Sequence, residues 1–135
     1  MKTISSSQNI NITDIVCSLN ILNKRAKTVK NPEQLYQLKY DVLNKLINEN
    51  KAKKICLHRF KRVRQAQYRT SNNDFDSKYF VLVECESHYF HLPANQTDIK
   101  SLKLELPLNN VRNKLNKMSY FHAKRNLKCY LKNSL

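Results

Sequence analysis

The sequence predicts an α+β fold, with an N-terminal helical hairpin, a small antiparallel sheet and a C-terminal helix. Apolar residues recur at helical spacing before residue 48, alternate as in strands between residues 54 and 92, and return to helical spacing after residue 119. The chain has 135 residues, enough for one compact domain, and 41% of them are hydrophobic. We therefore expect a mobile lead over residues 1–11 and a single domain over residues 12–135.

Two helices are expected in the first part of the chain. Between Thr13 and Lys27 the apolar positions follow helical spacing, and cations in the last turn suit the negative helix end. The second helix has a stronger start signal, because Asn31 is a candidate N-cap, Pro32 suits the first helical position and Glu33 lies in the first turn. A long apolar stripe follows. The short loop between the two helices predicts a helical hairpin.

The middle of the chain shows the alternation that is typical of strands. Ile55 and Leu57 alternate with Lys, Cys and His neighbours, as in a half-buried strand. Tyr79–Cys85 is the clearest strand, and its alternate residues face opposite sides. The next two residues are expected to form a tight turn. His88–Leu92 then returns antiparallel and ends at Pro93, because proline cannot donate a hydrogen bond to a neighbouring strand.

The remaining segments are a loop, an ambiguous stretch and a last helix. Residues 59–77 are polar, basic and rich in turn-forming residues, which predicts a loop. Residues 101–106 alternate weakly and fit neither a helix nor a strand clearly. Ser119 is a candidate N-cap for a helix over about Tyr120–Lys132, whose apolar residues share one face.

The net charge of +15 is concentrated in two blocks. Residues 51–69 carry eight basic and no acidic residues, residues 106–135 carry seven basic and none, and residues 70–105 are mildly acidic. A surface so positive repels itself unless it meets a polyanion, which in a cytosol is nucleic acid by default. An anionic membrane requires a helix with a large exposed apolar face instead. The charge therefore favours nucleic acid over a membrane, with a merely solvated basic surface as the alternative.

Several classes of function are excluded or disfavoured by composition. Glycine is absent, which excludes the glycine-rich phosphate loops of nucleotide-binding proteins. The longest apolar run, Tyr79–Val83, is too short to span a membrane, and the first fifteen residues lack the apolar segment of a secretory signal. We expect a cytoplasmic protein without a cofactor.

Cations and aromatic residues alternate in the first basic block, and more weakly in the segment Tyr120–Arg125. Cations neutralise phosphates and rings stack on bases, which is how proteins hold single strands. Within the first block, Phe60 and Tyr68 are the candidate stacking residues. The predicted nucleic-acid contacts are Arg25, Lys27, Lys53, Lys54, Arg59, Phe60, Lys61, Arg62, Arg64, Tyr68, Arg69, Lys124 and Arg125.

Two histidines provide an alternative in which the protein is a small ribonuclease. His58 and His91 fall on expected strands of one sheet. If both imidazoles reach one phosphate, within about 7 Å of each other, one acts as the base on the 2′-hydroxyl and the other as the acid on the leaving oxygen. The competing interpretation is that each ring is structural. Placement on opposite faces of the sheet would exclude the ribonuclease.

Cysteine and histidine, which are the residue types that bind zinc, occur together in the expected sheet region. The candidate sets are Cys56 with His58, and Cys85 with His88 and His91. Neither has a standard zinc spacing, so no metal is predicted.

A series of short runs occurs in the order and at the spacing found in a known family. The runs are Asn23–Thr28, Asn31-Pro32, Leu35-Tyr36, Leu38-Lys39, Lys51–Lys54, Leu57-His58, Val81–Cys85, Tyr89–His91 with Pro93, Arg112-Asn113, Met118-Ser119 and Ala123-Lys124. Over about residues 15–131 the chain resembles the YkyB-like proteins of bacilli, also called Kre. The resemblance implies a small cytoplasmic regulator of genetic competence, acting through the stability of the messenger RNA for the competence transcription factor.

The chain departs from the family pattern at a few positions. Cys56 and Glu86 stand where glycine is usual, and His88 stands where an aromatic residue is usual, which weakens the zinc hypothesis further. The stretch 59–77 is longer and more basic, so its binding role rests on charge alone. The family pattern is matched at Arg25, Lys27, His58, Tyr89, Phe90 and His91.

We therefore predict a nucleic-acid-binding regulator without catalysis of its own, which prefers RNA to DNA and acts post-transcriptionally. The alternatives are the ribonuclease and an adaptor without direct nucleic-acid binding, which would bind an acidic face on an RNA-processing or transcription protein.

Overall fold

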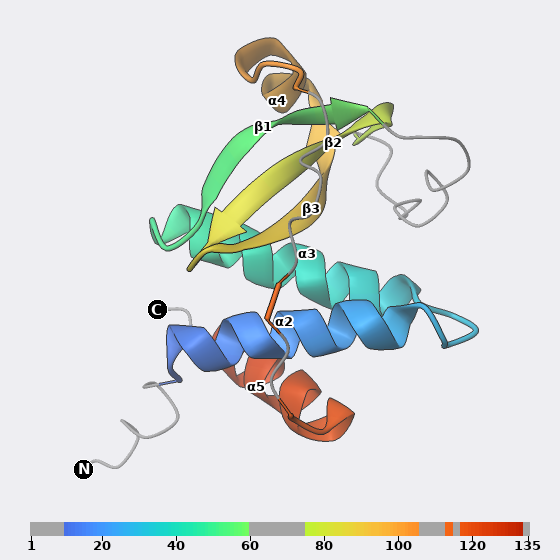
Figure 1. The fold of residues 1–135 in the computed structure, drawn as a ribbon, viewed down its shortest axis with the longest axis vertical. Coiled ribbons are helices and arrows are strands. Elements are labelled where there is room, and N and C mark those ends of the chain that lie inside the picture. Colours follow the sequence, from blue (N-terminus) through green and yellow to red (C-terminus); the bar gives the residue numbers. More distant parts are fainter. Residues whose placement is uncertain (1–9, 60–74, 106–112, 115–116, 134–135) are drawn as a thin grey trace.

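A computed structural model describes residues 10–59, 75–105, 113–114 and 117–133, and it confirms the α+β fold (Figure 1). The expected lead falls mostly on residues 1–9, and most of the expected basic loop on residues 60–74, so both lie outside the described residues. No helix in the described ranges is long and apolar enough to cross a membrane. The elements are α2 (Ile12–Ala26), α3 (Glu33–Asn48), β1 (Lys53–Arg59), β2 (Phe75–Cys85), β3 (His88–Asn95), α4 (Gln96–Ser101) and α5 (Tyr120–Lys132).

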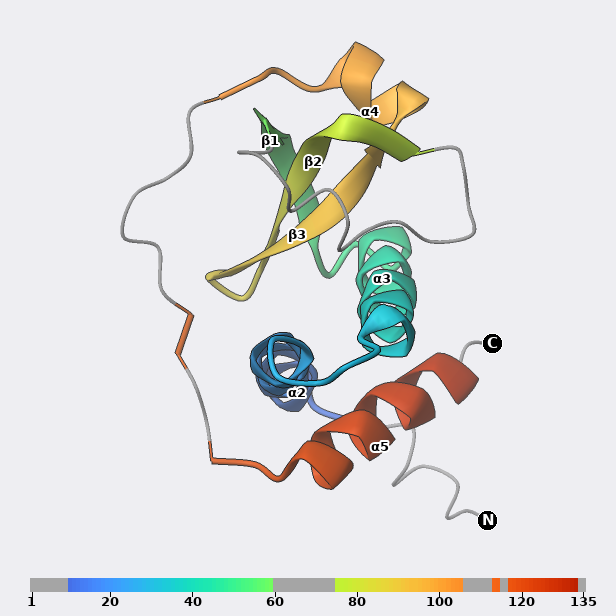
Figure 2. The same ribbon diagram turned by 90° about the vertical axis from the view of Figure 1, so that its right-hand side faces the viewer.

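The helical hairpin lies between the sheet and the last helix (Figure 2). One face of the three-stranded sheet covers α2 and α3, and α5 packs against the other side of the same hairpin. The short helix α4 lies at the end of the sheet that is remote from α5 (Figures 1 and 2). The outer face of the sheet and the outer face of α5 therefore lie on opposite sides of the molecule.

The helices α2 and α3 begin in different ways, α2 with a side-chain cap and α3 with a proline. The side chain of Asn11 accepts a hydrogen bond from the Thr13 amide at the start of α2. The expected Asn31 cap of α3 is wrong, since Pro32 holds the cap position and no side chain caps the helix. The Pro32 carbonyl accepts the first helical hydrogen bond, and proline has no N–H that needs a partner.

Two tight reversals form without glycine. Asn50 has a φ of 60°, and the amides of Asn50 and Lys51 return to carbonyls of the last turn of α3, as in a Schellman cap. The expected turn between β2 and β3 is confirmed, and both of its residues have positive φ, 49° at Glu86 and 64° at Ser87. Side chains with a Cβ are disfavoured in this region of φ, so the hairpin turn is a strained position.

The sheet is antiparallel in the order β1-β2-β3. The expectation that a strand ends at Pro93 is wrong, since β3 continues to Asn95 and Pro93 pairs with Phe80. The strand β3 is at the sheet edge, where alternate residues direct their backbone groups away from β2, so a missing N–H leaves no pairing unmade. The strand β2 also begins earlier than expected, at Phe75.

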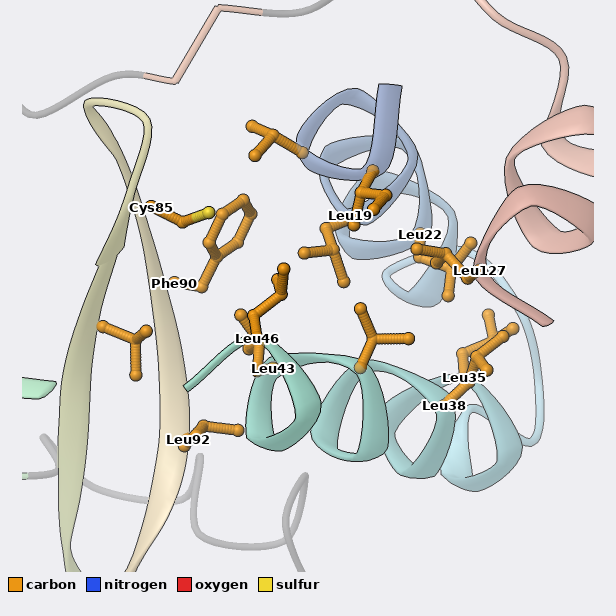
Figure 3. Close-up of a cluster of buried hydrophobic side chains, with 14 of the residues drawn as sticks. Leu19, Leu22, Leu35, Leu38, Leu43, Leu46, Cys85, Phe90, Leu92 and Leu127 are labelled. Atoms are coloured by element: carbon orange, nitrogen blue, oxygen red, sulfur yellow. The ribbon is translucent and has the colours of Figure 1, made fainter. Parts of the chain in front are cut away.

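The core lies between the sheet and the helices, and α5 closes its far side (Figure 3). The sheet contributes the side chains of Leu57, Val81, Val83, Cys85, Phe90 and Leu92, and α5 contributes those of Ala123, Leu127 and Tyr130. The expected α5 is confirmed over Tyr120–Lys132, with the Ser119 hydroxyl accepting from the His122 amide at 3.0 Å.

The helix α4 was not predicted. Its signal is a capping box, in which the side chains of Asn95 and Asp98 accept from each other's amides. After α4, Leu104 forms an isolated parallel bridge to Leu57 on the free edge of β1.

Candidate nucleic-acid interface

The exposed side of α5 is a continuous basic face. Its members recur at spacings of three or four residues, which places them on one side of a helix. We call Phe121, Lys124, Arg125, Lys128 and Lys132 the α5 basic face. From Phe121 to Lys132 it extends about 16 Å along the helix axis. No acidic residue occurs between residues 106 and 135, so no local carboxylate on this segment compensates the four cations.

The other side of α5 is anchored in the core, which fixes the direction of the basic face. Ala123 and Leu127 are fully buried, and Tyr130 is nearly so. The Tyr130 hydroxyl donates to the Glu49 carboxylate, while the Lys45 ammonium donates to the Tyr130 carbonyl. The hydrogen bond from Tyr130 holds the pKa of Glu49 below its ordinary value. The C-terminal end of α5 is thereby tied to the end of α3.

The N-terminal end of α5 meets the last turn of α2 at an aromatic ring. The Arg25 guanidinium lies 5.2 Å from the centroid of the Tyr120 ring, and the Lys124 ammonium lies 5.8 Å from it. Both distances are within the range of cation–π attraction. The ring of Tyr120 thus holds two predicted contact residues, from opposite ends of the chain, near one another. We call Arg25, Tyr120, Phe121 and Lys124 the Tyr120 cluster.

Phe121 is the most exposed large hydrophobic side chain among the described residues. Its side chain is 80% exposed, and its ring lies 5.6 Å from that of Tyr120 in an edge-to-face arrangement. Leu104, at 55%, is the other exposed large hydrophobic residue that the described ranges contain, and it lies on the edge of β1. Phe121 is therefore an exposed aromatic ring on a basic surface.

The other predicted contact residues are dispersed. Lys27 is exposed after α2, and Arg125 is exposed on the α5 basic face. Lys53 and Arg59 are exposed at the two ends of β1. The six candidates from Phe60 to Arg69 lie outside the described residues.

Lys54 already has a partner. Its ammonium lies 2.7 Å from the carboxylate of Asp98, a residue that is 4% exposed. Because Asp98 also caps α4, this pair links β1 to the helix that follows the sheet. The structure therefore gives Lys54 a structural role that its position in a basic run concealed.

The outer face of the sheet brings the two candidate catalytic histidines together. We call His58, Phe80, Leu82 and His91 the outer sheet face; His58 pairs with Phe80, and Leu82 with His91. The imidazole centroids of His58 and His91 lie 6.4 Å apart, and the Phe80 ring contacts both. The two histidines are on one face, as the ribonuclease alternative requires.

The two imidazoles differ in access. His58 is 3% exposed, and its Nε2 has no hydrogen-bond partner in the described part of the chain. Burial lowers the pKa of His58 below the ordinary value, while Glu105 partly opposes that shift. His91 is exposed. A neutral imidazole is the right form for a general base, but Nε2 of His58 has less than 1 Å² of accessible surface.

The zinc set of Cys85, His88 and His91 does not converge. Cys85 is in the core on the helix-facing side of the sheet, whereas His91 pairs with Leu82 on the outer sheet face. Among the residues that the structure describes, no group of three or more potential ligands is close enough to hold a metal ion.

The predicted contacts omit four residues of the interface. Tyr120 and Phe121 lie in the segment Tyr120–Arg125, where the alternation of cations and rings was only a weak signal, and the other two are Lys128 and Lys132. The last two could have been found from their helical spacing with Phe121 and Lys124, had the basic residues been placed on the helix as the apolar ones were. The role of Tyr120 had no sequence signal, because it depends on the packing of α5 against α2.

Comparison with known proteins places most of the chain in one family. Residues 11–134 match the family described as YkyB-like protein. The chain is similar to the uncharacterized protein YkyB of Bacillus subtilis (strain 168), with 37% identity over 111 residues. That similarity covers 82% of this chain and 66% of the relative, slightly less than two thirds of its length. No solved structure matches the chain.

Proposed function

The chain belongs to the YkyB-like family, and we propose that it is a cytoplasmic nucleic-acid-binding protein that prefers RNA to DNA and acts in post-transcriptional regulation. The observation that carries the proposal is the α5 basic face, whose four cations line one side of a helix without an acidic neighbour in the segment. Such a row matches the regular negative charge of a phosphate backbone, and each neutralised phosphate releases counterions.

The composition of the face favours nucleic acid over a membrane. A helix that lies on a membrane buries a broad apolar face. Phe121 is the one large apolar residue exposed on α5, and the cations of the same face surround it. The interleaving of one ring with several cations is the pattern of proteins that hold nucleic-acid strands.

The preference for RNA and the regulatory role have a different support. They rest on the resemblance to the Kre proteins and the link to competence that it implies. The RNA and DNA arms of the experiment below test the preference for RNA separately from charge.

The test is a binding series with single-stranded RNA, single-stranded DNA and duplex DNA of equal length at two salt concentrations. The variant reverses two cations of the α5 basic face, Lys124→Glu and Lys128→Glu. For single strands we expect weaker binding and a slope of log affinity against log salt that flattens by about 1.4, since each lost phosphate contact removes about 0.7. Circular dichroism should show an unchanged fold.

The matched control reverses two exposed lysines at the other end of the molecule, Lys100→Glu and Lys103→Glu. It changes the net charge by the same amount. Equal losses in both variants would mean diffuse attraction to a basic particle and would contradict a defined site. Unchanged binding in the α5 variant would move the site to the basic block between Arg59 and Arg64, or to a protein partner as in the adaptor alternative.

The ribonuclease is retained as a second candidate because His58 and His91 lie 6.4 Å apart on one face. Under the binding proposal, RNA incubated with an excess of pure protein near pH 6–7 stays intact. Cleavage that is lost in both His58→Gln and His91→Gln, with binding retained, would establish the enzyme instead.

A further inference from the structure

We propose that Phe121 is a stacking platform for one unpaired base of RNA, with the phosphates on either side of that base held by the cations of the α5 basic face. This inference rests on the proposed function and adds the class of substrate, a single strand rather than a duplex.

The first support is the exposure of the ring. Large aromatic side chains are usually buried, because their transfer out of water is strongly favourable. The Phe121 side chain is 80% exposed, although the neighbouring positions of α5 on the inner side are fully packed. A face of the ring is therefore open to a planar partner from solution.

The second support is the restraint on the position of the ring. The Ser119 cap fixes the first turn of α5, in which Phe121 is the second residue. The Phe121 ring lies 5.6 Å from that of Tyr120 in an edge-to-face pair, and the Tyr120 ring itself has Arg25 and Lys124 within 5.8 Å of its centroid. A platform with a fixed backbone loses less conformational entropy when a base stacks on it.

The third support is the charge around the ring. Arg125 lies one turn further along α5 on the same side as Phe121, and Lys124 is next to it. A base that stacks on Phe121 would place its flanking phosphates near these cations. An apolar protein surface would bring no such anions, and bases that are paired in a duplex do not expose their faces.

The occupant is assigned as RNA because unpaired, splayed bases that stack on aromatic side chains are the usual target of sequence-dependent RNA recognition. Single-stranded DNA offers the same faces, so the experiment includes it as a separate arm.

The test compares Phe121→Ala and Phe121→Trp with the unchanged protein. The ligands are an unstructured RNA 12-mer, the same sequence as DNA, and the RNA duplex. A 2-aminopurine base in the single strands reports stacking as a loss of fluorescence. We expect Phe121→Ala to weaken single-strand RNA binding on the order of 10-fold, to abolish the fluorescence change, and to leave duplex affinity and the salt slope unchanged. Phe121→Trp should restore both single-strand signals.

The matched control is Leu104→Ala, which removes the other exposed large hydrophobic side chain and should change neither signal. Equal weakening of single strands and duplex by Phe121→Ala would overturn the stacking platform. Unchanged single-strand binding of Phe121→Ala would also overturn the platform. If the Lys124→Glu/Lys128→Glu variant nevertheless binds weakly, the proposed function would stand. Stronger binding of the DNA strand than of the RNA strand would overturn the assignment to RNA. Absence of binding to every ligand would end both proposals.

Discussion

The α5 basic face and the outer sheet face lie on opposite sides of the molecule and differ in how they treat polar and aromatic groups (Figure 2). On α5, cations and an aromatic ring are exposed. On the sheet, an imidazole and Leu82 are buried, and the ring of Phe80 packs against both histidines. The first surface leaves its groups available to a ligand, whereas the second uses His58 and Leu82 in packing and leaves only His91 exposed. Residues of similar chemistry therefore take different roles according to their burial.

The largest expected effect is on the free energy of unfolding, when one apolar residue of each face is truncated. Leu82→Ala on the outer sheet face should lower the free energy of unfolding by about 3 kcal/mol, because Leu82 is 4% exposed and its truncation leaves a cavity. Phe121→Ala should change it by less than about 0.5 kcal/mol. Urea denaturation of the two variants measures both values. Equal destabilisation would show that Phe121 is a packing residue and would remove it from the interface.

A second prediction separates a paired from an unpaired lysine. Lys54→Gln should lower the free energy of unfolding by about 1–2 kcal/mol, because Asp98 would remain buried without its cation, while partial exposure of Lys54 limits the loss. Lys128→Gln should leave stability unchanged and flatten the single-strand salt slope by about 0.7. A larger loss of RNA affinity in Lys54→Gln than in Lys128→Gln would show that Lys54, and not the α5 basic face, contacts RNA.

A third prediction uses the strained turn of the sheet. The double variant Glu86→Asn/Ser87→Gly should raise the free energy of unfolding by about 1 kcal/mol, since Asn-Gly is the preferred pair where both turn residues have positive φ. RNA affinity should not change, because the turn belongs to the sheet, which the helical hairpin separates from α5 (Figure 2). A thermal melt and a binding isotherm of the same sample check both statements. A double variant that is less stable than the wild type would show that the Glu86-Ser87 turn is not strained.

The smallest expected effect is a pH dependence. Burial keeps the pKa of His58 below its ordinary value of 6.5, so as the pH falls the unfolded chain binds a proton before the folded protein does. The free energy of unfolding therefore decreases as the pH falls through 6.5 and stops decreasing, for this group, below the folded-state pKa.

His58→Gln should reduce this decrease between pH 7 and 5. Denaturation midpoints over this range measure the difference between the variant and the wild type. Parallel curves for the wild type and His58→Gln would show that the buried imidazole titrates as in the unfolded chain.

Much of the fold was determined by the sequence itself. Local spacing and local backbone preference predict the bounds of α2, α3 and α5, the two faces of β2 and the turn at Glu86-Ser87. None of these features requires knowledge of tertiary packing. The position of β3 at an edge did need that knowledge, and for this reason the strand end expected at Pro93 was wrong. In the candidate site, the cations of α5 were predictable from charge and spacing.

The assembly of the site was decided by the tertiary structure alone. Arg25 and Lys124 are far apart in the sequence, and they come together because α5 packs on α2 and brings both within 5.8 Å of the centroid of the Tyr120 ring. Lys54 stands in a basic run, yet the return of the chain after β3 places it against Asp98. Charge and periodicity are properties of neighbours along the chain. Whether a cation is compensated or left for a ligand depends on neighbours in space, which are set by the shared burial of apolar faces.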